Sequence, residues 1–172
     1  MKNFTTKAIA VALMVFGFGI SNSYGQAYQQ GDNLLNLGVG LGGGFGTPIG
    51  FSYEHGFSDK ISGGVYASYS SESMSVWTST LKSTYILAAA RASYHFDFGV
   101  ENLDPYLGVL LGYNIASSKW TGASFPGSSA KAGGVIYGGH AGARYFFGEK
   151  FGVFAEAGYG IGTLNVGLTF KL

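Results

Sequence analysis

The stretch Leu164–Leu172 reads LNVGLTFKL, and its apolar residues stand at every second position. The positions between them hold Asn165, Gly167, Thr169 and Lys171. Successive side chains of a β-strand point to opposite faces, so this stretch predicts a strand with one apolar face and one small or polar face. The stretch Leu35–Leu41 (LNLGVGL) repeats the pattern near the other end of the chain.

Six further segments alternate in a similar but less regular way. They are Ile49–Phe57, Ile61–Ser70, Ser83–Phe96, Pro105–Ile115, Val135–Phe147 and Phe151–Gly160. Most are close to the roughly 9–11 residues that a tilted transmembrane strand needs. Together with the two stretches above they give eight strands, an even number, as antiparallel closure with both chain ends on one side requires.

The composition fits a membrane protein. Of 172 residues 30 are glycine, 47% are hydrophobic and only 11% are charged, against about 25% charged residues in ordinary proteins. The chain is therefore too apolar to be disordered. Its formal net charge of +1 gives nucleic-acid binding no electrostatic support. Without cysteine, neither a disulfide nor a lipoprotein anchor is possible.

The N-terminal residues have the layout of a secretory signal peptide. Lys2 and Lys7 flank a short basic start, the apolar run Ala8–Ile20 follows, and then comes the polar stretch SNSYGQA. The apolar run is too short to cross a bilayer core of about 30 Å as a helix. We therefore predict a signal peptide over residues 1–27, with cleavage after Gly25 or Ala27, and a barrel domain over residues 28–172.

An exported apolar chain with no other long apolar run points to one architecture. Only helices and closed barrels can cross a bilayer, because every backbone polar group must be paired internally. The pattern predicts an all-β fold, an eight-stranded antiparallel up-and-down transmembrane β-barrel. The lumen of such a barrel is narrow, so the glycine-rich face fits inside it. The apolar face must then lie outside. A soluble ligand-binding barrel would need the opposite arrangement.

Aromatic residues and connections support this orientation. Aromatic residues gather towards the ends of the strands, as the two membrane interfaces favour. The connections Ser58–Lys60, Asp97–Asp104 and Gly148–Lys150 are short and polar, which is typical of periplasmic turns. Four other connections are predicted to be surface loops: Gly43–Pro48, Ser71–Lys82, Ala116–Gly134 and the short piece at Ile161–Gly162. The longest of them, Ala116–Gly134, is expected to be mobile.

Most of the charges within strands fall on the inward face. Buried charges require partners. If tight turns set the register, Glu54 and Glu156 each lie opposite a glycine, which leaves room for a larger partner. We predict a lumenal polar network that plugs and stiffens the barrel; a proton path or ligand site is the alternative. Its members are Glu54, Tyr66, Arg91, His140, Arg144 and Glu156, and His95 and Lys171 also face inward.

Several residues do not fit the alternation. His55 faces lipid, although it lies close to a turn, where an interface could hold it. Six apolar residues face the lumen, so they either pack there or mark a bulge that shifts the register. They are Tyr85, Leu87, Leu110, Ile136, Phe146 and Phe154.

The C-terminal octet Asn165–Leu172 resembles the signal read by the machinery that assembles outer-membrane barrels. The matching positions are the polar Asn165, Gly167, the hydrophobic Phe170 and the terminal Leu172, where many such proteins have Phe. The stretch Ala143–Gly160 resembles the outer-membrane β-barrel domain of porin-family-like proteins. Together with the signal peptide and eight strands, these features resemble a small outer-membrane barrel of the OmpA/OmpX type.

That resemblance implies a Gram-negative outer membrane, periplasmic termini and four surface loops. It implies contact with outer-membrane lipid or lipopolysaccharide and with the barrel assembly machinery, and a monomer without a cofactor. The resemblance says little about function, since such barrels have diverse roles. We expect envelope integrity or surface contact through the loops; a narrow passive channel is the alternative.

Enzymatic activity is not expected. Some outer-membrane barrels modify lipid A, and the deacylase type has a His-x-Ser motif. Here His140 is followed by Ala141 and Gly142. The palmitoyltransferase type has an amphipathic helix before the barrel, for which Gln26–Gly31 is too short. The three histidines lack the spacing of metal ligands, so no metal site is predicted.

Overall fold

A computed structural model describes residues 27–42, 46–76, 79–122, 129–159 and 163–172. The predicted signal peptide lies outside these residues except for Ala27. The described residues form eight strands: β1 (Asn33–Leu41), β2 (Ile49–Ser58), β3 (Ile61–Val76), β4 (Ser79–His95), β5 (Leu103–Gly122), β6 (Ser129–Phe146), β7 (Phe151–Gly158) and β8 (Leu164–Lys171). No helix within the described residues is long and apolar enough to cross a membrane.

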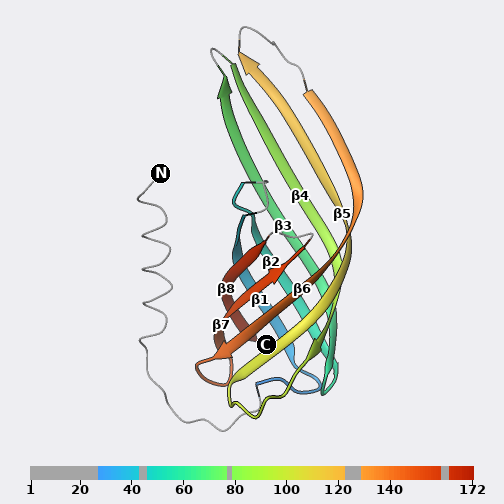
Figure 1. Ribbon diagram of the computed structural model, residues 1–172, viewed down its shortest axis with the longest axis vertical. Coiled ribbons are helices and arrows are strands. Elements are labelled where there is room, and N and C mark those ends of the chain that lie inside the picture. Colours follow the sequence, from blue (N-terminus) through green and yellow to red (C-terminus); the bar gives the residue numbers. More distant parts are fainter. Residues whose placement is uncertain (1–26, 43–45, 77–78, 123–128, 160–162) are drawn as a thin grey trace.

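The eight strands close into an antiparallel up-and-down barrel (Figure 1). Each strand pairs with its neighbours in the sequence, and β1 pairs with β8. The predicted fold class is confirmed. The tight turns also set the predicted register, because Gly64 lies opposite Glu54 and Gly142 lies opposite Glu156.

The two faces of the wall have the predicted character. Val109 is 64% exposed and Tyr137 is 75% exposed on the outer face, although both are large and apolar. An outer row of rings follows the end of the barrel that carries the turns at 59–60, 96–102 and 147–150, which we call the short-turn end. In it Phe151 lies 5.4 Å from Phe170 between ring centroids. The opposite end is called the loop end.

The inward apolar residues fill the lumen. Leu87, Leu110, Phe146 and Phe154 are buried, and the pairing of their strands continues through them without a shift. In the described residues the one register irregularity is between Gly56 and Ser58, beside a turn. Of the two interpretations left open by the sequence, packing of the lumen is therefore the one observed. Outside the wall, His55 contacts the Asn33 side chain, with 2.9 Å between Nδ1 and Oδ1.

Two of the predicted loops are mainly strands. Strands β3 to β6 rise well beyond β1, β2, β7 and β8 (Figure 1). Residues 71–76, 79–84, 117–122 and 129–131 continue the four-stranded sheet above the barrel, and we call this part the extension. The predictions of loops at Ser71–Lys82 and Ala116–Gly134 were wrong where these segments form strands. Residues 77–78 and 123–128 lie outside the described residues. Hydrophobic alternation stops there, but the backbone pairing continues.

The segment before β1 folds against the short-turn end. The Gly31 amide donates to the Gly56 carbonyl, and the Gly56 amide donates to the Asp32 carbonyl. The Tyr28 ring enters the mouth of the barrel and stacks on His95, with 3.5 Å between ring centroids. At the other terminus the Leu172 amide donates to the Asn33 carbonyl. The described ends of the chain therefore lie together at this end of the barrel.

Candidate functional site

The lumen contains a belt of paired charges, and Arg144 on β6 lies at its centre. Arg144 is fully buried and forms ion pairs with Glu54 on β2 and, at 2.8 Å, with Asp104 on β5. Its Nε donates to Asn36 Oδ1 on β1 at 3.1 Å. The guanidinium also lies over the Tyr106 ring, 4.1 Å from its centroid. One side chain on β6 thus joins β1, β2 and β5.

Arg91 on β4 forms the second centre of the belt. Its Nη2 lies 2.7 Å from Glu156 Oε2, and its Nε lies 3.4 Å from Glu54 Oε1. The same Nη2 lies 2.8 Å from His140 Nε2. Because an arginine can only donate, this nitrogen of His140 accepts the hydrogen bond and carries no proton. Tyr106 adds a hydrogen bond to Glu156 at 3.0 Å.

Hydroxyl groups complete the coordination of Glu54. Its Oε2 accepts hydrogen bonds from Ser62 at 2.9 Å and from Ser93 at 2.6 Å. The carboxylate therefore has two arginines and two hydroxyls around it, all within the barrel. Such complete pairing is what allows a charged group to be buried.

Ser62, His95 and Asp104 lie in the order of a catalytic triad. Ser62 Oγ lies 2.8 Å from His95 Nε2, and His95 Nδ1 lies 2.6 Å from Asp104 Oδ1. However, Ser62 is 0% exposed, and its oxygen also lies 2.9 Å from the Glu54 carboxylate. A carboxylate at that position would repel the negative charge that develops during acyl transfer. The arrangement therefore suits a structural hydrogen-bond chain.

Apolar layers lie on both sides of the belt. Towards the loop end Tyr66, Leu87, Ala89 and Leu110 pack together. Towards the short-turn end the cluster contains Ala27, Tyr28, Leu34 and Phe146. The structure thus places five of the six predicted network residues in the belt. Tyr66, the sixth, packs in the adjoining apolar cluster with Leu87 and Ala89. It also lines a small hollow together with Arg91 and Glu156, so its membership of the network stays a prediction.

Little open space remains beside the belt. A hollow lined by Tyr66, Arg91, Phe154 and Glu156 measures about 10 Å³, which is roughly the space for one water molecule.

At the short-turn end Tyr28 donates to the Ser58 carbonyl at 2.9 Å. Burial, together with the negative charges of Asp104, Asp32 and Glu54, raises the pKa of the Tyr28 phenol to about 12. This ring therefore stays neutral at the mouth of the barrel.

A cavity of about 350 Å³ lies between Tyr28 and the short turns, lined in part by Lys60, His95 and Asp104. It adjoins the Tyr28 ring rather than the centre of the belt. Among the described residues, no group of three or more His, Cys, Asp and Glu side chains is arranged to hold a metal ion.

Solved structures provide the comparison. The N-terminal β-barrel domain of Pseudomonas aeruginosa OprF matches with a TM-score of 0.60 and 19% identity, over 84% of this chain and 99% of that one. Neisserial surface protein A matches with a TM-score of 0.53 and 19% identity, over 82% and 95%. The outer membrane protein OprG of Pseudomonas aeruginosa matches with a TM-score of 0.51 and 15% identity, over 86% and 99%.

This chain has the fold of the small eight-stranded outer-membrane barrels. The predicted resemblance in fold is thereby confirmed. No protein-family model and no curated protein sequence matches the chain.

The proposed assembly signal forms the closing strand of this outer-membrane barrel fold. Asn165 faces inward, opposite Glu156, and Gly167 lies inward, opposite Gly38. Phe170 lies on the outer face against Phe151, and Leu172 is largely exposed. Recognition of these four residues by an assembly machinery stays a prediction.

Sequence reasoning missed several members of the belt. Asp104 was assigned to the turn Asp97–Asp104, but it is the second residue of β5 and is buried. Tyr106 shares the inward face with Leu110, so alternation alone could have identified it. Ser62, Ser93 and Asn36 also lie on inward positions, but small polar residues are frequent there and nothing in the sequence distinguishes these three.

Proposed function

We propose that the protein is an integral outer-membrane barrel with a sealed lumen, and that it acts through its surface rather than through a channel or an active site. The observation that carries this proposal is the belt of paired charges. Arg91, Arg144, Glu54 and Glu156 are all buried and form ion pairs with one another across the lumen. In this proposal the belt leaves an ion or solute no continuous path through the lumen.

The outer surface supports the location in a membrane. Exposed aliphatic side chains cover the wall between two ends that are rich in aromatic residues, as transmembrane barrels require. In this proposal the short turns and both ends of the mature chain face the periplasm, and the loops face outward. The extension then projects from the cell surface and provides the contact area for envelope integrity or surface interaction. The signal peptide, the assembly machinery as a partner and the monomeric state belong to the same proposal.

Conductance across planar bilayers tests the sealed lumen. The purified protein is folded in detergent, and its heat-dependent shift in gel mobility is confirmed. It is then inserted into the bilayer, and a general porin in a separate bilayer serves as the positive control. We expect no steady conductance from this protein. A stable conductance step would contradict the sealed lumen and favour the narrow channel. A mass change in lipid A on expression would contradict the non-enzymatic role.

A further inference from the structure

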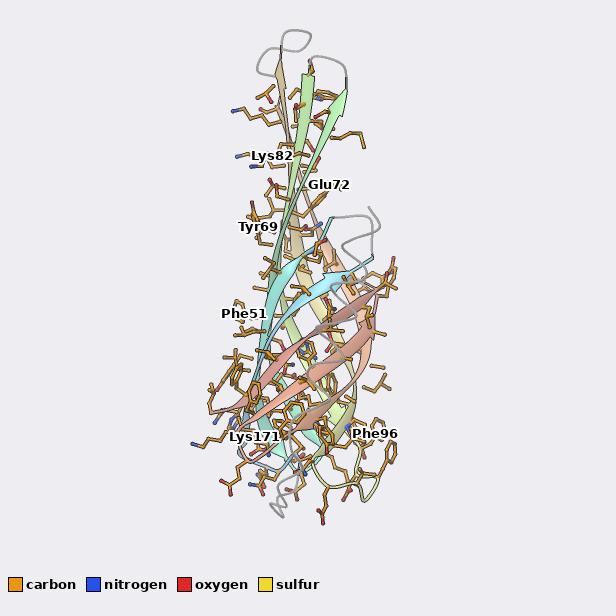
Figure 2. All side chains as sticks on the ribbon, turned by 90° about the vertical axis from the view of Figure 1, so that its left-hand side faces the viewer. Phe51, Tyr69, Glu72, Lys82, Phe96 and Lys171 are labelled. Atoms are coloured by element: carbon orange, nitrogen blue, oxygen red, sulfur yellow. The ribbon has the colours of Figure 1, made fainter. Side chains whose placement is uncertain are left out.

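Three lysines lie close together on the outer face of the extension. Lys82 on β4 is directly opposite Lys119 on β5. Lys131 on β6 is opposite Ser117, two residues from Lys119, so it is a diagonal neighbour of Lys119. All three are exposed. In Figure 2, Tyr69 and Lys82 lie on one side of the sheet and Glu72 on the other. We call Lys82, Lys119 and Lys131 the lysine patch.

The lysine patch has no internal counter-charge. Like charges directly opposite one another destabilise a pair of strands. Among the described residues, none lies within ion-pair distance of these three ammonium groups. Glu72, the nearest acid along the strands, belongs to the inner face. An external anion would therefore relieve a repulsion that the fold leaves in place.

The lysine patch lies just beyond the expected lipid head-group layer, within reach of a bent lysine side chain. On the outer face of β4, exposed Ile86 comes first, then Thr84, then Lys82. On β5 the order is Ile115, Ser117, Lys119. At roughly 3.3 Å per residue the patch begins about 13 Å along a tilted strand from the last apolar row. Head groups occupy about 5–8 Å on each side of the core, and lysine side chains can bend towards them.

The charge is also distributed unequally between the two ends. The described loop end carries the lysine patch and one acid, Glu72. The short-turn end carries more acids than bases: Asp32, Asp59, Asp97, Glu101 and Glu149 against Lys60, Lys150 and Lys171. The positive charge is therefore concentrated at the end that would face the outer leaflet.

We propose that the lysine patch binds the phosphate groups of anionic lipids in the outer leaflet. This inference rests on the proposed outer-membrane location and names the lipid that the loop end would contact. Each lysine provides a point charge for a phosphate. The flanking Thr84 and Ser117 hydroxyls lie on the same face and can donate further hydrogen bonds.

Lipid binding by the folded protein in detergent micelles tests this proposal. The probes are bis-phosphorylated lipid A, its dephosphorylated form, and inositol hexakisphosphate as a soluble polyphosphate. The variant Lys82→Gln/Lys119→Gln is compared with Lys60→Gln/Lys150→Gln, which removes the same charge from the short-turn end. At about fivefold per surface lysine, we expect the first variant to bind phosphorylated lipid A roughly 25-fold more weakly. Adding Lys131→Gln should bring the loss to about 100-fold.

The controls separate this inference from the proposed function. We expect the short-turn variant to bind like the wild type, and the dephosphorylated lipid to bind weakly to both. Equal binding by all folded variants, or equal loss in both double variants, would overturn the lysine patch as a lipid site. Tighter binding of the soluble polyphosphate than of lipid A would also overturn it. A wild-type protein without a heat-dependent mobility shift would overturn the barrel assignment itself.

Discussion

Arg144 shows at the scale of one residue how a charge can be buried in a barrel. Its guanidinium has no exposure and uses Nε, Nη1 and Nη2 for partners on three different strands. A buried ion pair is weak evidence of net stabilisation, because desolvation offsets much of the attraction. Removing only one partner is different, since the remaining charges are left buried and unpaired.

We therefore expect Arg144→Ala to lower the free energy of unfolding by about 3–5 kcal/mol. Glu54 and Asp104 would each lose a cationic partner inside the lumen. Urea titration of the folded protein in detergent measures the change. Lys150→Ala, at an exposed turn position, serves as the control, and it should stay within about 0.5 kcal/mol of wild type. Equal stability of the two variants would contradict the role of the belt in stabilising the barrel.

Side-chain placement could be predicted at this scale only in part. Alternation placed Glu54, Arg91 and Arg144 on the inward face, and the structure has all three there. It could not tell that Tyr66 packs with Leu87 while Tyr106 reaches Glu156. Which inward residues meet depends on the stagger between strands, and the stagger across non-adjacent strands is not encoded in local periodicity.

At the scale of the strand, glycine lets the wall accept large lumenal side chains. Gly64 on β3 lies opposite Glu54 on β2. A methyl group added to Gly64 would press on the Tyr53 carbonyl oxygen and lie 2.8 Å from the Glu54 Cα atom. These are backbone atoms, so a rotamer change could not relieve the contact.

Gly64→Ala should therefore destabilise the barrel by about 1–3 kcal/mol, as overpacking does. The matched control is Gly139→Ala, since an added Cβ there meets no atom closer than the Gly108 carbonyl oxygen at 3.6 Å. The temperature at which the folded band is lost on a semi-native gel compares the two variants. If Gly64→Ala melts at the same temperature as Gly139→Ala, the close approach is not a constraint.

Strand lengths mark the limit of what alternation can predict. The short strands β1, β2, β7 and β8 were predicted to within about two residues, because apolar and small residues alternate to their ends. In β3 and β5 the pattern fades after Tyr69 and Ile115, yet the strands continue to Val76 and Gly122. Serine and threonine occupy both faces there. Backbone hydrogen bonds to neighbouring strands, rather than burial, maintain that part of the sheet.

At the scale of the whole molecule, we expect the barrel and the extension to be separable. The charged belt and both apolar clusters lie within the closed ring, whereas the described residues of the extension pair only among β3 to β6. Stability should therefore depend on the ring, and any surface activity should depend on the extension.

Replacing residues 71–84 and residues 117–131 by short Asn-Gly turns tests this separation. Ser70 pairs with Tyr85 and Ala116 pairs with Ala132, so each cut joins residues that are already neighbours. We expect the shortened protein to keep its heat-dependent mobility shift within a few degrees and to lose the binding of phosphorylated lipid A. Failure of the shortened chain to form a heat-resistant band would show that the extension stabilises the ring.

The pairing of β1 with β8 has a consequence for how the barrel forms. The Arg144 contact with Asn36 joins residues 108 positions apart on β6 and β1, and it can form only when strands far apart in the sequence come together. Long-range contacts of this kind are slow to form because loop closure costs entropy before any contact is gained. Until then the belt residues line an open, hydrated sheet. We therefore expect desolvation of the charges and closure of the ring to occur together, so that ring closure is a slow and cooperative step of folding.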